Sequence, residues 1–305
     1  MNQKYKPPVS VILPTYNRAN TLNKSILSVL NQTYEDFELI IVDDGSSDNT
    51  KEVIEHFEDN RIRYVKHEKN KGAASAMNTG IRKSKGFLIS IQNSDDIWLP
   101  EKLESEISGF DSSNTMLGVV YSGLYQIKGN KKMYVPSSSV KKKEGSLNHE
   151  LLLGNFVNGL SLIRKACFEK VGLYDEELVG LEDWEMYIRI SEYYDFKFID
   201  KPLIIAHLSP DSLSVKPSIF INATQMIITK HFKKFDKNKK ALAINYGYLG
   251  SWSCLDGKLK EGRDYFRNAI NLKPFILSFY FAFFASLFGK KVFKFFLNLK
   301  KLERI

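Results

Sequence analysis

Two neighbouring carboxylates, Asp95 and Asp96, directly follow an apolar run at residues 87–92 and precede a predicted helix start near Pro100. Like charges side by side repel each other most strongly where water screens them least. Two explanations account for the pair. Carboxylates stabilise a helix N-terminus by capping it and interacting with its dipole, and they are also preferred ligands of hard divalent cations. The spacing of the two residues does not decide between a helix cap and a cation site.

Two more polar clusters stand directly after apolar runs. The sequence "PTYNR" at residues 14–18 follows the run at 9–13, and "DDGSSDN" at residues 43–49 follows the run at 38–43. Each cluster alone could be an ordinary turn, since Pro, Asn, Asp, Gly and Ser are common turn residues. In open α/β sheets, however, ligands bind outside the carboxyl ends of the strands. We therefore expect all three polar clusters to converge at one edge of a sheet.

The elements that must position these clusters alternate along the chain. Strand patterns occupy residues 9–13, 38–43, 61–66 and 87–92, with helical patterns at 20–31, 48–58 and 72–84 between them. A second block has strand patterns at 160–164, 196–199 and 203–207 and a helical pattern at 182–193. The alternation predicts an α/β fold with a mostly parallel central sheet flanked by helices. Residues 128–145, rich in Lys and Ser, predict a solvated connection or mobile loop.

Five segments add a resemblance to a known family. They are "VSVILPTYNR", "QTYEDFELIIVDDGSSDNT", "NKGAASAMNTGI", "NSDDIWLPEKL" and "GLEDWEMYIRI", in that order. Together they resemble the family 2 glycosyltransferases, which are inverting nucleotide-sugar enzymes with the GT-A fold, over residues 8–210. The resemblance implies a transferase of the hexosyltransferase type. Such an enzyme moves a sugar from a nucleoside-diphosphate sugar to a hydroxyl of a saccharide or lipid-linked acceptor, in cell-surface polysaccharide or glycan synthesis.

The resemblance also implies which residues hold the donor. Pro14, Tyr16 and Arg18 would border the nucleotide base, with the Tyr16 ring stacked on it. Asp44, the second Asp of "VDDGS", matches the residue that accepts the imide N–H of uracil, a role that suits a side chain with acceptors only. A UDP-sugar is therefore the expected donor.

The resemblance further implies a metal and a general base. Asp95 holds the last position of the D-x-D motif and would bind Mn²⁺ or Mg²⁺ at the donor's diphosphate, with Asp96 beside it. His207 falls where related enzymes often have a His near the metal, so it is either a third ligand or a partly buried histidine at a strand end. Asp183 in "LEDW" matches the base that removes the proton of the acceptor hydroxyl.

Two departures from the family pattern leave other functions open. Asn93 replaces the usual first Asp of D-x-D, so it could still hold a ribose hydroxyl but removes one negative charge. Met77 stands where Arg is common. A catalytically weakened nucleotide-sugar-binding scaffold is therefore an alternative, although the retained Asp44, Asp95 and Asp183 argue against it. A transferase that acts on polyprenyl phosphate is another, although a phosphate oxygen would need no such base.

Charge and composition narrow the partners. The 305 residues have a net charge of +9, and residues 289–305 contribute six Lys or Arg against one Glu. Because the basic residues concentrate in a hydrophobic C-terminal tail and match no nucleic-acid-binding motif, we expect no nucleic-acid partner. The first residues lack the apolar stretch of a secretory signal, which predicts a cytoplasmic protein. Cys167 and Cys254 are far apart and are expected to be buried thiols.

The pattern predicts a chain in three parts. Residues 1–217 would form the GT-A catalytic domain, with a nucleotide-binding half at 1–122 and an acceptor-binding half at 123–217. Residues 218–274 would form a helical extension, read either as a single tetratricopeptide-type hairpin or as a plain one. Residues 275–305 would form a membrane-associating tail.

The tail begins with an apolar stretch and continues with a basic one. The fourteen uncharged and mostly apolar residues 275–288 fall short of the about 20 needed to span a bilayer. Residues 290–302 suit a basic amphipathic helix in a membrane interface. This predicts peripheral attachment at the inner face of the cell membrane, with packing of the first stretch against the protein as the alternative.

Overall fold

The structure is a computed structural model that describes residues 8–110, 114–207 and 216–302. The chain forms two compact units. The first comprises Met1–Asn148 and Phe156–Ser209, and the second comprises His149–Asn155 and Pro210–Ile305. A short internal segment, His149–Asn155, thus belongs to the helical unit.

The first half of the sheet consists of parallel strands. These are β1 (Val9–Thr15), β2 (Phe37–Asp43), β3 (Ile62–Lys66) and β4 (Leu88–Ile91), in the spatial order β3, β2, β1, β4. Every residue of β2, and every residue of β1 except Pro14, is buried. Parallel sheets are covered on both faces, so their strands are continuous apolar runs rather than alternating ones.

The second half of the sheet is mixed. Its strands are β5 (Ile97–Trp98), β6 (Leu117–Lys128), β7 (Lys131–Val135), β8 (Leu162–Arg164) and β9 (Asp195–His207). β8 pairs antiparallel with β4 and β6, and β9 pairs parallel with β6 and antiparallel with β5. The α/β prediction is confirmed, but "mostly parallel" is wrong, because four of the eight strand pairs among the described residues are antiparallel.

Two local predictions in this half are also wrong. Residues 131–135 form β7, which pairs with β6 as a hairpin, so the predicted connection at 128–145 is partly a strand. The two strands predicted at 196–199 and 203–207 are one strand, β9, whose register against β6 shifts between Ser122 and Leu124. A register shift with extra residues on one strand is a β-bulge. The polar pair Asp200 and Lys201 at the shift interrupts the apolar pattern without ending the strand.

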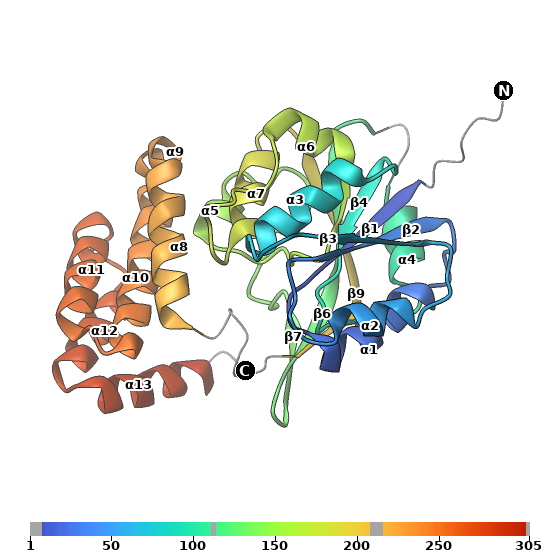
Figure 1. Ribbon diagram of the computed structural model, residues 1–305. Coiled ribbons are helices and arrows are strands. Elements are labelled where there is room, and N and C mark those ends of the chain that lie inside the picture. Colours follow the sequence, from blue (N-terminus) through green and yellow to red (C-terminus); the bar gives the residue numbers. More distant parts are fainter. Residues whose placement is uncertain (1–7, 111–113, 208–215, 303–305) are drawn as a thin grey trace. The chain divides into compact units, whose positions relative to one another are not determined.

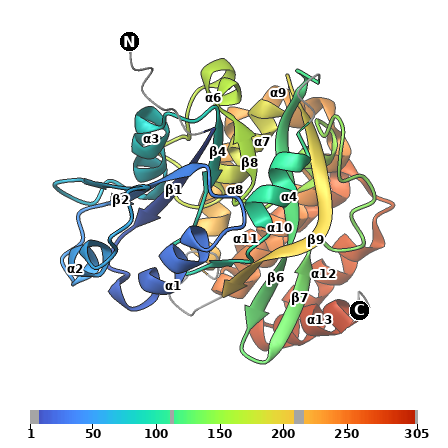
Figure 2. The same ribbon diagram turned by 90° about the vertical axis from the view of Figure 1, so that its right-hand side faces the viewer.

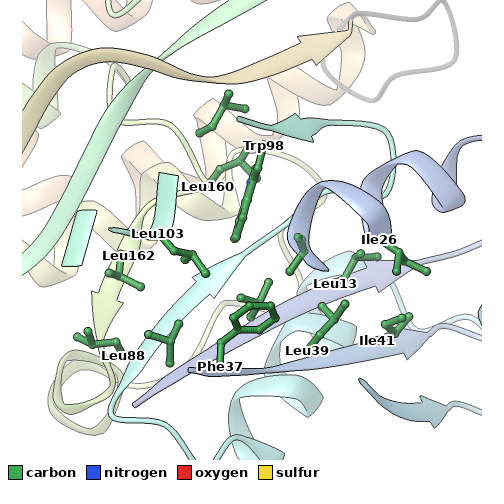
Figure 3. Close-up of a cluster of buried hydrophobic side chains, with 14 of the residues drawn as sticks. Leu13, Ile26, Phe37, Leu39, Ile41, Leu88, Trp98, Leu103, Leu160 and Leu162 are labelled. Carbon is green, nitrogen blue, oxygen red and sulfur yellow. The ribbon is translucent and has the colours of Figure 1, made fainter. Parts of the chain in front are cut away.

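Helices cover the sheet of the first unit (Figures 1 and 2). They are α1 (Ala19–Leu30), α2 (Thr50–Glu55), α3 (Ala73–Lys83), α4 (Lys102–Ser108), α6 (Lys165–Val171) and α7 (Glu182–Ile190). The core between α1, the parallel strands and α4 contains Leu13, Ile26 and Phe37, and it extends to Trp98 on β5 and Leu160 beside β8 (Figure 3). This single apolar cluster holds β1, β4 and β5 together and thereby fixes the loops at their ends.

The second unit is helical throughout its described residues. Its helices are α5 (Glu150–Leu153), α8 (Pro217–Lys230), α9 (Phe232–Lys237), α10 (Lys239–Asp256), α11 (Leu259–Leu272), α12 (Leu277–Leu287) and α13 (Lys290–Leu302). The predicted helical hairpin with a turn at residues 256–257 is confirmed as α10 and α11. Gly250 and Gly262 face each other across it, since an added Cβ at Gly262 would lie 2.8 Å from the Gly250 carbonyl oxygen.

Burial confirms the prediction for the two cysteines, since Cys167 and Cys254 are both buried free thiols. Trp98 and Trp184, next to the key carboxylates, are also buried and pack in the interior. Among the described residues, no helix has the length and apolarity that crossing a bilayer requires.

Candidate functional site

The loops after β1 and β2 are joined by hydrogen bonds. The Asn17 backbone N–H donates to Ser46 Oγ at 2.9 Å, and Asn17 Oδ1 accepts from the Ser47 backbone N–H at 2.9 Å. The Ala19 N–H at the start of α1 donates to Asp48 Oδ2 at 3.1 Å. Asn17 adopts a left-handed backbone (φ 51°), which Asn tolerates better than most residues. The two polar clusters thus form one braced surface.

The loop after β4 joins this surface from the other side. Arg18 Nη2 lies 3.8 Å from Asp95 Oδ2, and both side chains remain partly exposed. Ser25 Oγ on α1 donates to the Asn93 carbonyl oxygen at 2.7 Å. Gln92 Nε2 donates to the Asp96 carbonyl oxygen at 2.8 Å and so fixes the turn between β4 and β5. The predicted convergence of the three loops is confirmed.

Asp44 is held by three hydrogen-bond donors. Its carboxylate accepts from the backbone N–H groups of Lys71 (2.9 Å to Oδ1) and Gly72 (2.7 Å to Oδ2), and from His67 Nδ1 at 2.7 Å. His67 Nε2 in turn lies 3.0 Å from Thr79 Oγ1 on α3. The Lys71 N–H also lies 3.1 Å from Oδ2, so all of the about four lone-pair positions of the carboxylate face donors. Asp44 thereby fastens the segment before α3 to the site.

Asp96 is a buried carboxyl group beside a second carboxylate. Burial, together with the charge of Asp95, raises its pKa from 3.8 to about 7. The Asn93 side-chain amide donates to Asp96 Oδ2 at 2.8 Å, and a backbone hydrogen bond from His207 also favours the ionised form. These two donors offset only part of the shift. The repulsion between the adjacent carboxylates that the sequence suggests therefore contributes to the raised pKa of Asp96.

We expect Asp96→Asn to change how stability depends on pH. A carboxyl with a raised pKa binds more protons folded than unfolded, so its contribution to stability falls as pH rises from 3.8 to about 7 and is constant above that. Asn has no such titration. The free energy of unfolding of the variant, relative to the parent, should therefore increase by roughly 2 to 3 kcal/mol between about pH 5 and about pH 8, measured by urea unfolding at each pH.

A matched control is Asp59→Asn. The Asp59 pKa is lowered by its hydrogen bonds with Arg61, so this difference should not change with pH above about 5. A flat profile for Asp96→Asn over the same range would show that the Asp96 pKa is not raised.

Asp183 lies at the first turn of α7, where its Oδ1 accepts from the Trp184 backbone N–H at 2.7 Å. An added Cβ at Gly159 would lie 3.0 Å from Asp183 Oδ2, so Asp183 packs directly beside Gly159. Leu162 at the start of β8 pairs antiparallel with Ser90 on β4. The residues before β8 therefore lie level with the carboxyl end of β4, which places Asp183 at the same edge as the Asp95 loop.

A second acidic side chain accompanies Asp183. Burial and the neighbouring Asp183 charge raise the pKa of Glu182 from 4.5 to about 7, and its buried Oε2 has no hydrogen-bond partner among the residues that the structure describes. Leu181 just before it has a left-handed backbone (φ 59°), which is uncommon for a branched residue. Backbone conformations of this kind cluster at functional sites. The start of α7 is thus a tightly constrained acidic turn.

The other predicted site residues are placed as follows. Pro14 lies inside β1, paired with Val42 on β2, rather than in the loop. Tyr16 begins the loop with an exposed ring, available for stacking. His207 ends β9 with an exposed side chain. Met77 is buried on the inner face of α3 and contributes to the core.

The residues at this edge fit a cation only with help from a substrate. In the part of the chain that the structure describes, no three His, Cys, Asp or Glu side chains are grouped so as to hold a metal by themselves. Mg²⁺ sites commonly combine one or two carboxylates with substrate phosphates. Partly exposed Asp95 suits that arrangement, with the diphosphate supplying the remaining oxygens. Beside it, burial and the charge of Asp95 raise the pKa of Asp96.

The loop after β3 also belongs to this edge, although its residues were not predicted to lie there. This loop supplies His67, Lys71 and Gly72, which hold Asp44. The signal was available, because the polar residues 67–72 follow a parallel strand just as the other three clusters do. The rule that ligand sites lie outside the carboxyl ends of parallel strands applies to all four loops.

The chain is similar to known glycosyltransferases in both sequence and fold. The family model described as "Glycosyl transferase family 2" matches residues 10–172. An uncharacterised glycosyltransferase of Rickettsia prowazekii, RP339, is 34% identical over 211 residues, which cover 66% of this chain and 65% of that protein. WfgD of Escherichia coli, a UDP-Glc:alpha-D-GlcNAc-diphosphoundecaprenol beta-1,3-glucosyltransferase, is 44% identical over 122 residues (40% of this chain, 47% of WfgD).

The chain spans between 30% and 65% of the length of the Rickettsia relatives that it matches. Among solved structures, S. aureus TarS in complex with UDP-GlcNAc has a TM-score of 0.66 at 20% identity, covering 86% of this chain and 81% of that one. The Pyrobaculum calidifontis mannosyltransferase PcManGT, in complex with GDP-Man and Mn²⁺, has a TM-score of 0.62 at 17% identity, covering 88% and 76%. These likenesses show a shared GT-A fold.

Proposed function

Because the chain belongs to glycosyl transferase family 2, we propose that it transfers a sugar, with inversion at the anomeric carbon, from a UDP-sugar to a hydroxyl of a saccharide or lipid-linked acceptor. The supporting observation is the single edge of the sheet where four loops and the start of α7 meet. Arg18 and Asp95 lie there within 3.8 Å, and Asp183 lies at the same edge by strand register. A nucleotide site and a candidate base are thus brought to one place.

In this proposal Asp183 acts as the general base. Its carboxylate takes the proton of the acceptor hydroxyl as that oxygen attacks the anomeric carbon, and the bond from this carbon to the diphosphate oxygen breaks on the opposite face. The products are the extended saccharide and UDP. Glu182 beside it has a pKa near 7, so this pair of carboxyl groups can carry the transferred proton at neutral pH.

On the donor side, Tyr16 stacks on the base, and Asp44 accepts the uracil imide N–H in place of one of its present donors. Arg18 and Asp95 lie beside the diphosphate. A divalent cation bound at Asp95 would supply charge neutralisation for the leaving diphosphate. Asn93 holds Asp96 through its side-chain amide, which gives this departure from D-x-D a structural role.

The acceptor class is supported by one relative and by the second half of the sheet. WfgD acts on a diphosphoundecaprenol-linked sugar, and here the hairpin of β6 and β7 adds Lys131 and Lys132 to residues 123–217, the proposed acceptor-binding half. Cationic side chains suit an acceptor that contains a diphosphate. We place this reaction at the cytoplasmic face of the cell membrane, in the synthesis of cell-surface glycans.

The test is the melting temperature of the purified chain with UDP, GDP or dTDP, each with and without Mn²⁺. A ligand at about 100 times its Kd stabilises the folded state by about 2.7 kcal/mol. We expect a shift with UDP that grows when Mn²⁺ is present, and Asp95→Asn should remove the Mn²⁺-dependent part. No shift with any nucleotide would contradict the proposed donor site and favour a different role for the fold.

A further inference from the structure

Helix α12 has an apolar face on both of its sides. Phe279, Ala282 and Ser286 form a buried side that packs within the helical unit. The opposite side presents Leu277, Phe281, Phe284 and Phe288 at spacings of four, three and four residues, and these side chains are between 55% and 72% exposed. A surface helix normally has a polar outer face. Residues 277–287 contain no charged residue at all.

Helix α13 extends this exposed surface and makes it basic. Phe293 is fully buried and its ring centroid lies 6.0 Å from that of Phe266 on α11. Phe295 is 64% exposed, and Lys290, Lys291 and Lys294 are exposed beside it. The two helices contact each other in the helical unit (Figures 1 and 2). Phe293 therefore anchors α13 to the rest of the helical unit.

We propose that the exposed faces of α12 and α13 together form a docking surface for a bilayer that contains anionic lipid. We call this surface the α12/α13 face. It consists of Phe275, Leu277, Phe281, Phe284, Leu287, Phe288, Val292 and Phe295 with Lys290, Lys291 and Lys294. Aromatic side chains enter the boundary between headgroups and acyl chains, while lysines pair with the anionic headgroups.

The charge distribution favours lipid over a second copy of the chain. Residues 265–302 contain six Lys and one Arg but no Asp or Glu. A symmetric dimer through this face would set the same patch on both partners against itself, so lysines would face lysines without a carboxylate to pair. An anionic bilayer offers both an apolar interior and the missing negative charge.

The length of α12 and its contacts with the helical unit allow binding at the bilayer surface but not a span across the bilayer. The eleven residues of α12 extend about 16 Å at 1.5 Å per residue, about half of the roughly 30 Å hydrocarbon thickness. One side of the helix is also occupied by contacts with the rest of the helical unit. The face can therefore enter the interface only to the depth of its exposed side chains. This inference does not depend on the proposed transferase activity.

The experiment is co-sedimentation of the full chain with vesicles of phosphatidylcholine, with and without phosphatidylglycerol. The parent should bind the vesicles that contain phosphatidylglycerol, and less so as salt is raised. The triple variant Phe281→Gln/Phe284→Gln/Phe288→Gln should lower the partition coefficient about 100-fold. Lys290→Gln/Lys291→Gln/Lys294→Gln should lower it about 100-fold on anionic vesicles only.

The matched control is Phe232→Gln, an aromatic residue 51% exposed on α9 of the same unit, which should bind vesicles like the parent. Equal melting temperatures would show that all variants are folded. Parent chain that fails to bind anionic vesicles, or an aromatic triple variant that binds as well as the parent, would overturn the proposal. So would a parent dimer that the triple variant converts to a monomer without any vesicle binding, since a second copy would then occupy the face.

Discussion

Asp183→Asn should lower the rate of sugar transfer by about 10²- to 10⁴-fold while leaving donor binding unchanged. The loss follows because an amide cannot take the proton of the acceptor hydroxyl, and general-base catalysis contributes about this much. The local fold should survive, since Asn retains the oxygen that accepts from the Trp184 backbone N–H. The measurement is UDP release with the UDP-sugar that stabilises the parent most, together with the melting shift that reports donor binding.

Two further variants provide a control and test which of the two neighbouring carboxyl groups is the base. Asp264→Asn replaces an exposed carboxylate on α11 that pairs with Arg267, and it should transfer sugar at the parent rate. Glu182→Gln removes the neighbouring carboxyl group. If Asp183→Asn kept more than about a tenth of the activity and Glu182→Gln did not, the base would be Glu182 and the assignment by family motif would be wrong.

Lys102→Met should lower the free energy of unfolding by about 3–5 kcal/mol, because it leaves a buried carboxylate without its partner. Lys102 Nζ on α4 lies 2.7 Å from Glu106 Oε2, and both side chains are fully buried. Burial lowers the pKa of Lys102 and raises that of Glu106, whereas the opposite charge of each partner counteracts both shifts. Each side chain is therefore stabilised in its charged form by the other. Lys102 Nζ also lies 4.0 Å from the ring centroid of Trp98, two residues after Asp96.

The double variant Lys102→Met/Glu106→Leu should recover most of this loss, since replacing a whole buried ion pair with apolar residues is often neutral. The matched control is the exposed pair Lys51 and Glu55, also four residues apart on a helix. Lys51→Met should change the free energy of unfolding by less than about 1 kcal/mol. Urea unfolding measures all three, and an equally small effect of Lys102→Met would show that water reaches the pair.

Much of the donor side of the site could be predicted from the sequence. The reason is that β1, β2 and β4 are parallel and buried on both faces, so each appears as a continuous apolar run followed at once by a polar loop. The strand rule then places Tyr16, Asp44 and Asp95 at one edge without any knowledge of side-chain geometry. The same rule applied to β3 would have included His67.

The second half of the sheet could not be predicted in this way. β7 begins with two exposed lysines and lies in a lysine- and serine-rich stretch, so its sequence resembles a loop, and its pairing with β6 is what makes it a strand. The continuity of β9 across Asp200 depends on pairing with β6, residues distant in sequence. Strand propensity depends on such neighbours more than helix propensity does, and the neighbours are known only in the folded chain.

The sequence by itself determined the family, the α/β class and which carboxylates stand at strand ends, because these follow from local order and spacing. Only the tertiary structure decided which carboxylates receive hydrogen bonds that stabilise their ionised form and which have a raised pKa. Asp44 receives three donors and Asp96 is left with a pKa near 7. It also decided that Phe293 packs inward while Phe295 faces outward. Burial and electrostatics depend on the distances between residues far apart in the chain, and folding alone sets those distances.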